Sequence, residues 1–127
     1  MSKILLIEDE VALQKTLGES LKSRKHEVQS ALDGEAGLRL AKSGKPDLIL
    51  LDLILPKKHG LDVLKELRKD DETSNIPVII LTNLENVGEV ESAIELGATT
   101  YLVKANYSLN EVIEKVEEAL KKSAQSD

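Results

Sequence analysis

The stretch "DLILLDLILP", residues 47–56, decides the fold of this chain. Four aliphatic residues run without interruption into Asp52, and three more follow it. A continuous aliphatic run, without alternating polar residues, is typical of a strand that is covered on both faces of a parallel sheet. A carboxylate in such surroundings is costly to desolvate unless another group compensates for its charge. Asp52 therefore needs an explanation that packing alone does not supply.

Four other segments have the character of strands, and helical patterns separate them. Residues 3–8, 77–82 and 100–104 are mostly apolar, whereas residues 26–31 are more polar and fit a strand at the edge of a sheet. Between the strands, apolar residues recur every three or four positions, as on one face of a helix. Five strand–helix repeats predict an α/β fold, with one five-stranded parallel sheet and helices on both faces. The polar second strand favours the order 2-1-3-4-5.

Residues with known end preferences mark the helix boundaries. Gly44 and Gly97 follow the second and fourth helices, where a glycine commonly closes the last turn. The second helix, residues 34–43, has the weakest pattern because it holds two glycines. The segment "SLNE", residues 108–111, predicts a capping box at the start of the last helix.

Length and composition restrict the class of protein. The 127 residues suggest one domain, predicted over residues 1–122, with a frayed tail at 123–127. The net charge of −6 and the near absence of aromatic residues argue against direct binding of nucleic acid. The longest apolar runs have four residues, far short of the roughly 20 needed to cross a membrane. Without cysteine, signal-peptide pattern or membrane insertion, a cytoplasmic location is the expectation.

Polar residues stand where the four apolar strands end. They are Glu8 and Asp9 after the first strand, Asp52 after the third, Thr82 after the fourth and Lys104 after the fifth. The carboxyl ends of parallel strands meet at one edge of the sheet, and ligands bind there at the point where the strand order reverses. Three clustered carboxylates repel one another unless cations join them. Lys104 supplies one positive charge, and Mg²⁺ prefers such oxygen ligands.

This set of groups can carry out phosphoryl transfer. A carboxylate beside Mg²⁺, an ammonium group and a hydroxyl can attack a phosphoryl group, because the cations neutralise charge on the phosphoryl oxygens. The product is an aspartyl phosphate, a recognised form of covalent carboxylate chemistry. Asp52 is the candidate acceptor.

At these residues the chain resembles the receiver domain of bacterial two-component response regulators, most closely the single-domain chemotaxis type. The resemblance covers about residues 3–121. It is carried by the acidic pair, by "DLILPKKHG" with Pro56 and Gly60, and by Thr82, Tyr101 and Lys104. It implies a flavodoxin-like fold of five β–α units, and a signalling switch rather than an enzyme with a substrate of its own.

The resemblance also implies a role for each matching residue. Asp52 accepts the phosphoryl group of a histidine kinase or phosphotransfer protein, and slow self-dephosphorylation removes it again. Mg²⁺ is held by Glu8, Asp9, Asp52 and the backbone carbonyl of Ile54. Lys104 pairs with the phosphate.

Thr82 and Tyr101 form the switch that the resemblance implies. Thr82 moves to donate its hydroxyl to the phosphate, and Tyr101 turns inward into the space that Thr82 vacates. The face made by the fourth helix, the fifth strand and the fifth helix then changes its affinity for a downstream protein target. A monomer or a weak phosphorylation-dependent dimer is expected.

Four positions depart from the family pattern. Glu8 stands where Asp is commonest and, being one methylene longer, should still reach the metal. Asn83 is larger than the usual residue and could crowd the phosphate, and Lys58 replaces an apolar residue. Ala105 follows Lys104 where a proline is usual. Because a cis peptide before a non-proline residue costs roughly 3–4 kcal/mol, a trans peptide is expected there, or a strained cis one.

Other interpretations stay open. The chain could be a receiver-like scaffold that binds its partners without phosphorylation, an option raised by Asn83 and Ala105. A phosphatase with an aspartate nucleophile is disfavoured, because such enzymes commonly carry a second acid two residues later, where Ile54 stands. Taken singly, Asp52 could cap a helix and Tyr101 could serve packing alone.

Overall fold

Strands and helices alternate along the whole chain in the computed structural model, which describes residues 2–84 and 86–125. The strands are β1 (Lys3–Ile7), β2 (Glu27–Ala31), β3 (Leu48–Leu51), β4 (Val78–Thr82) and β5 (Thr100–Val103). The helices are α1 (Val11–Ser23), α2 (Gly34–Gly44), α3 (Gly60–Lys69), α4 (Val87–Glu95) and α5 (Leu109–Gln125), and a short 3₁₀ turn, η1 (Lys104–Asn106), joins β5 to α5.

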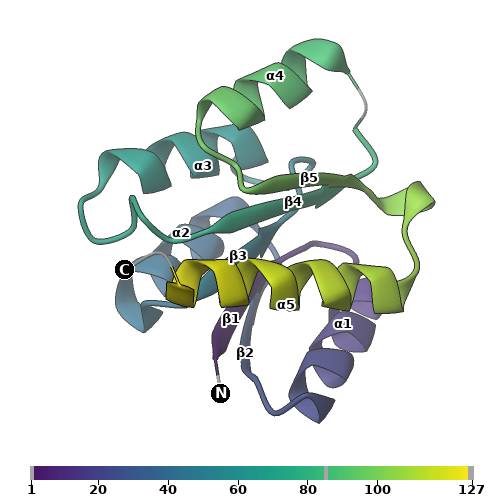
Figure 1. The fold of residues 1–127 in the computed structure, drawn as a ribbon. Coiled ribbons are helices and arrows are strands. Elements are labelled where there is room, and N and C mark those ends of the chain that lie inside the picture. The colour runs from purple at the N-terminus through teal and green to yellow at the C-terminus, as the bar shows by residue number, and fades with distance from the viewer. Residues whose placement is uncertain (1, 85, 126–127) are drawn as a thin grey trace.

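The strands form one parallel sheet in the order β2-β1-β3-β4-β5, which confirms the predicted α/β fold and the predicted strand order. The polar strand β2 lies at one edge and β5 at the other (Figure 1). The order reverses between β1 and β3, where Ile7 stands beside Leu51. The residues that follow these two positions therefore leave the sheet side by side.

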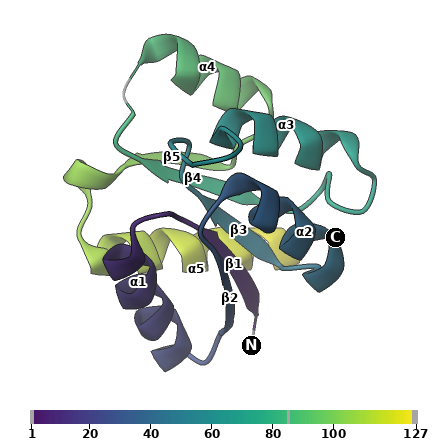
Figure 2. The same ribbon diagram turned by 180° about the vertical axis from the view of Figure 1, so that it is seen from behind.

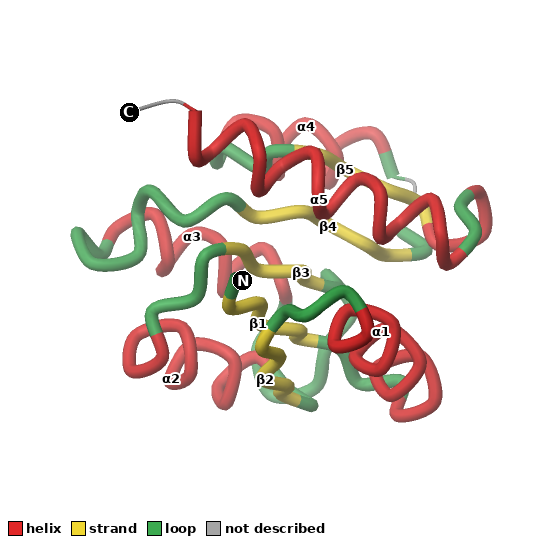
Figure 3. The backbone as a smooth tube through the Cα atoms, turned by 60° about the horizontal axis from the view of Figure 1, so that its bottom comes forward, coloured by secondary structure: helices red, strands yellow, loops and turns green. Residues whose placement is uncertain are grey.

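Helices cover both faces of the sheet. The core on one face is shared with α1 and α5, and the core on the other face with α2, α3 and α4 (Figures 1 and 2). Along β1, Leu5 and Ile7 belong to the second core, whereas Ile4 and Leu6 belong to the first. From Ile4 to Ile7 every position of β1 is buried, which explains the continuous aliphatic run in its sequence. Figure 3 shows the strands as a layer between the helices.

The helix ends confirm two predicted signals and correct a third. Ser108 and Glu111 form the capping box, with Ser108 N 2.9 Å from Glu111 Oε1 and Glu111 N 3.2 Å from Ser108 Oγ. Gly97 has a φ of 81° just after α4, as predicted. The prediction that Gly44 caps α2 is wrong: Gly44 is helical, and Lys45 takes the left-handed conformation with a φ of 46°.

Gly44 lies against the side chain of Gln29 on the edge strand. A Cβ atom there would lie 2.5 Å from the side-chain oxygen of Gln29 on β2. Because that oxygen ends a flexible side chain, it can move aside, so this contact does not require a glycine. The left-handed turn falls one residue later, at Lys45.

The last helix is longer than the sequence predicts. Residues 123–125 continue α5, although they belong to the segment 123–127 that was expected to be frayed. Residues 126–127 lie outside the described part of the chain. Within residues 2–84 and 86–125, no helix has both the length and the apolar character to span a membrane.

Candidate functional site

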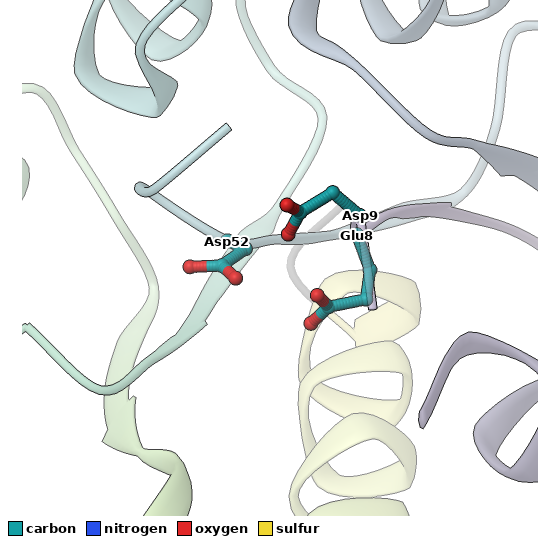
Figure 4. A group of neighbouring side chains, drawn as sticks. All are labelled: Glu8, Asp9 and Asp52. Atoms are coloured by element: carbon teal, nitrogen blue, oxygen red, sulfur yellow. The ribbon is translucent and has the colours of Figure 1, made fainter. Parts of the chain in front are cut away.

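Three carboxyl groups meet at the carboxyl edge of the sheet. Glu8 and Asp9 follow β1, and Asp52 follows β3. Because β1 and β3 pair in parallel up to Ile7 and Leu51, the acids that come next are brought together. One oxygen from each of the three side chains lies within 4.8 Å of the others, and Figure 4 shows the carboxyl groups turned toward a common space. The predicted cluster of acids is therefore present.

Burial differs among the three acids. Glu8 and Asp52 are each only 4% exposed, whereas Asp9 is exposed to solvent. Two buried acids next to each other are unfavourable unless positive charge or hydrogen bonds compensate for their lost hydration. The backbone N–H groups of Glu10 and Ile54 donate to them, at 2.9 Å from Glu8 Oε2 and 3.1 Å from Asp52 Oδ1.

Lys104 supplies the positive charge from the far side of the site. It begins η1 immediately after β5, and its Nζ atom lies 2.8 Å from Glu8 Oε1 and 2.9 Å from Asp52 Oδ2. A third acid, Glu10, also reaches this ammonium group, with Oε1 at 3.1 Å. Sequence reasoning missed Glu10, although it directly follows the acidic pair in the run "EDE".

These contacts shift the proton affinities of the site. Burial raises the pKa of the Glu8 carboxyl group, and the charge of Asp52 adds to the increase, while the hydrogen bond from Lys104 opposes it. Burial lowers the pKa of the Lys104 ammonium group, but its hydrogen bonds to Glu8 and Asp52 outweigh that effect and raise its pKa overall. Lys104 therefore carries a positive charge at neutral pH, while burial favours the neutral form of Glu8.

Thr82 and Tyr101 are linked through one residue of the loop between β4 and α4. Thr82 ends β4 and is fully buried, and its hydroxyl oxygen accepts a long hydrogen bond of 3.4 Å from the N–H of Leu84. The hydroxyl of Tyr101, on β5, donates to the carbonyl of Leu84 at 2.5 Å. Leu84 was not predicted as a site residue. Its contacts couple the end of β4 to the side chain of Tyr101.

The loop that follows Asp52 is held in place by Gly60, at the start of α3. The N–H of Gly60 donates to Leu53 O at 2.8 Å. A Cβ atom at Gly60 would lie 2.4 Å from Leu53 Cα and 2.5 Å from Asp52 O, so no larger residue fits without moving this loop. Gly60 therefore helps to fix the backbone that carries Asp52.

Three other positions depart from the family pattern, at residues 58, 83 and 105. The side chain of Asn83 is exposed, and Lys58 forms an ion pair with Glu66. The peptide bond between Lys104 and Ala105 is trans, as expected, and the described residues include no cis peptide. The side chain of Ile54 is 52% exposed; the metal-binding role of its carbonyl stays a prediction.

The donor set fits a hard divalent cation. Glu8, Asp9 and Asp52 offer only carboxylate oxygens, which are the ligands that Mg²⁺ takes in proteins, commonly with waters and a phosphate oxygen completing its shell. The exposed position of Asp9 leaves an open side through which water and a phosphoryl group can reach the ion. The described residues therefore can bind a metal next to Lys104.

A five-stranded parallel α/β sheet with three acids at the point of strand reversal, and a lysine from the edge strand beside them, defines a class of open α/β domain with a polar site beyond its strand ends. A family model for the response regulator receiver domain matches residues 4–117. The chain therefore belongs to the response regulator receiver domain family. Members of this family are signalling domains.

Comparison with individual proteins agrees with this assignment. The chain is 44% identical to the transcriptional regulatory protein CiaR of Streptococcus pneumoniae over 123 residues, covering 97% of this chain and 53% of that protein. It thus spans about half the length of the curated relatives it matches.

Solved structures show the same architecture. A CheY-like receiver domain protein from Methanospirillum hungatei superposes with a TM-score of 0.94, covering 100% of this chain and 99% of that chain; at 22% identity this likeness concerns the fold alone. The receiver domain of the sensor histidine kinase PA1611 from Pseudomonas aeruginosa, solved with magnesium in its active-site cleft, has a TM-score of 0.84 and 28% identity, covering 94% of this chain and 98% of that one.

Proposed function

We propose that this domain is a phosphorylation-dependent switch and that Asp52 accepts the phosphoryl group. The observation that carries the proposal is the position of the Asp52 carboxylate, whose Oδ2 lies 2.9 Å from Lys104 Nζ and whose neighbours are Glu8 and Asp9. One carboxylate is thus placed beside a fixed cation and an oxygen-rich site for a second cation. Packing requires no such arrangement.

The donor is a phosphohistidine of a histidine kinase or a phosphotransfer protein. A carboxylate oxygen of Asp52 forms a bond to phosphorus while the bond from phosphorus to the histidine nitrogen breaks, and the imidazole leaves with the bonding electron pair. Glu8, Asp9, Asp52 and the carbonyl of Ile54 would hold Mg²⁺, which would neutralise charge on the phosphoryl oxygens. Lys104 contributes a second positive charge on the side of β5. Slow hydrolysis then returns the free aspartate.

The conformational change that follows phosphorylation begins at Thr82 and Tyr101. When the Thr82 hydroxyl turns to donate to a phosphate oxygen, its contact with Leu84 N is lost and the loop before α4 rearranges. The Tyr101 hydroxyl, which donates to the carbonyl of Leu84, moves inward with that loop. The surface of α4, β5 and α5 then presents a changed face to a protein target.

The α4 helix already has apolar side chains available for such a target. Val87 is 70% exposed and Ile94 is 52% exposed, and seven positions apart they lie on the same side of the helix. CiaR, which is named a transcriptional regulatory protein, is about twice as long as this chain. A protein surface, either a separate partner or another domain, is therefore the proposed target, without direct contact to nucleic acid and with at most weak phosphorylation-dependent dimerisation.

A direct test is incubation with acetyl phosphate and Mg²⁺, followed by intact mass measurement. Wild type should gain the mass of one phosphoryl group, and Asp52→Asn should not. Beryllofluoride should shift the amide NMR signals of the loop before α4 in wild type only. An unchanged mass together with unchanged spectra would overturn the proposal. Partner binding that is equal for wild type and Asp52→Asn would instead favour the phosphorylation-independent scaffold.

A further inference from the structure

We propose that Glu10 is a displaceable clamp on Lys104 that restrains phosphorylation of Asp52. This inference rests on the proposed function and assigns a positioning residue to the same site. Glu10 Oε1 lies 3.1 Å from Lys104 Nζ. The two residues are 94 positions apart in the sequence, but both lie at the carboxyl edge of the sheet. Glu10 is thus a third acid on the ammonium group that the incoming phosphoryl oxygens need.

The side chain of Glu10 is not engaged at the start of its own helix. Glu10 is the N-cap residue of α1, a position at which the shorter side chains of Ser, Thr, Asp and Asn accept hydrogen bonds from the first N–H groups of the helix. The Glu10 side chain makes no such hydrogen bond. It reaches Lys104 instead, so moving it away from Lys104 breaks no helix cap.

Glu10 also differs from the other two partners of Lys104. Glu8 and Asp52 are buried and belong to the group of acids that can hold a metal, whereas Glu10 lies outside that group. The Glu10 side chain is 57% exposed, while that of Lys104 is 11% exposed. Glu10 can therefore swing into solvent without disturbing the metal ligands, which Glu8 and Asp52 cannot do.

The negative charge of Glu10 should disfavour phosphorylation of Asp52. A phosphoryl group on Asp52 brings anionic oxygens to Lys104, and the carboxylate of Glu10 occupies one of the donor directions of the same ammonium group. The phosphoryl oxygens must displace Glu10, and the displaced carboxylate still repels them. Removing the Glu10 contact should consequently favour the phosphorylated state.

The test compares wild type with Glu10→Gln, which removes the charge, and Glu10→Asp, which keeps the charge but shortens the side chain by one methylene. Glu19→Gln is the matched control, because Glu19 is exposed farther along α1 and removes the same unit of charge. At low salt, Glu10→Gln should bind beryllofluoride about two- to fivefold more tightly than wild type, the range expected for one exposed ion pair. Glu10→Asp, which loses the contact but keeps the charge, should fall between wild type and Glu10→Gln, and Glu19→Gln should match wild type.

A second measurement tests the clamp without any phosphate analogue. Proton exchange at the Lys104 ammonium group, followed by NMR of Mg²⁺-free protein, should be faster in Glu10→Gln than in wild type and unchanged in Glu19→Gln. Unchanged exchange, or unchanged beryllofluoride affinity in Glu10→Gln when wild type binds it, would overturn the clamp alone. Failure of both wild type and Glu10→Gln to bind beryllofluoride would instead overturn the proposed function and the clamp's role in restraining it.

Discussion

The Oδ2 atom of Asp52 lies 2.9 Å from Nζ of Lys104, although the two residues are 52 positions apart in the chain. Asp52 follows β3 and Lys104 follows β5, with β4 between the two strands. The contact therefore reaches across the end of β4. The long side chain of a lysine can cover that distance, whereas a shorter side chain cannot. It joins the proposed phosphoryl acceptor to a cation that the fold keeps charged.

Loss of the Lys104 charge should destabilise the domain when no metal is present. In Lys104→Gln, two buried acids keep their mutual repulsion without the ammonium group between them. Chemical unfolding in EDTA at neutral pH should show a decrease of about 1–3 kcal/mol in the free energy of unfolding. Lys15→Gln, an exposed change on α1, is the control and should have little effect. Equal stability of Lys104→Gln and wild type would contradict the electrostatic account of the site.

Asp9→Asn should separate charge repulsion from metal binding. Asp9 is exposed, but one of its oxygens lies within 4.8 Å of those of Glu8 and Asp52. In EDTA, the variant should be more stable than wild type by up to about 1 kcal/mol, because one repulsive charge is removed. With Mg²⁺ at about 100 times its Kd, wild type should gain about 2.7 kcal/mol.

The same Asp9→Asn variant should gain much less from Mg²⁺ than wild type does. Thermal unfolding in EDTA and in MgCl₂ measures both effects, and CaCl₂ shows whether the site prefers the smaller ion. A wild-type midpoint that does not respond to Mg²⁺ would speak against a metal site formed by these acids.

Glu8 should make stability depend on pH in the absence of metal. Its pKa in the folded protein is raised above the ordinary value of 4.5, chiefly by burial. The folded state therefore binds the proton more tightly than the unfolded state does, and the stabilising contribution of Glu8 is fully present below pH 4.5. That contribution is lost as the pH rises through the raised pKa of the folded state.

The comparison of wild type with Glu8→Gln isolates this contribution. Urea unfolding in EDTA should show that the stability of Glu8→Gln relative to wild type increases as the pH rises above 4.5, and becomes constant above the raised pKa. The control is Glu19→Gln, whose difference from wild type should be small throughout because the side chain is exposed. A difference for Glu8→Gln that is independent of pH would rule out a raised pKa.

Arg68 should support stability at the end of the molecule opposite to the site. Its guanidinium group donates to four backbone carbonyls, Leu96 O, Gly97 O, Ser74 O and Ile76 O, at 2.9 to 3.1 Å. It therefore links the turn after α4 to the loop before β4 through hydrogen bonds to both segments. Arg68→Met should lower the free energy of unfolding by about 2–3 kcal/mol, because carbonyls lose charged donors. Arg39→Met, an exposed change on α2, is the control, and beryllofluoride binding to folded Arg68→Met should be retained.

Much of the fold and the candidate site could be predicted because a parallel sheet with helices on both faces requires a recognisable hydrophobic pattern in the sequence. Buried strands require continuous aliphatic runs, and the alternation of runs with helical periodicity determines the α/β class. Since the carboxyl ends of parallel strands share one edge, the acids after residues 7 and 51 and the lysine after residue 103 had to lie at the same rim of the sheet. Asp52 could thus be recognised as a carboxylate at the rim rather than in the core.

The tertiary structure decided the contacts that depend on the paths of loops and on long side chains. The hydrophobic pattern of the sequence does not show that the Glu10 side chain points to Lys104 and not to its own helix. Nor does it show that Leu84 links Thr82 to Tyr101 through hydrogen bonds. It also does not show that Lys45, rather than Gly44, takes the left-handed turn after α2. The sequence by itself determined which residues reach the rim of the sheet. Which of them touch there was decided by three-dimensional packing, since short-range patterns carry no information on side-chain direction across neighbouring strands.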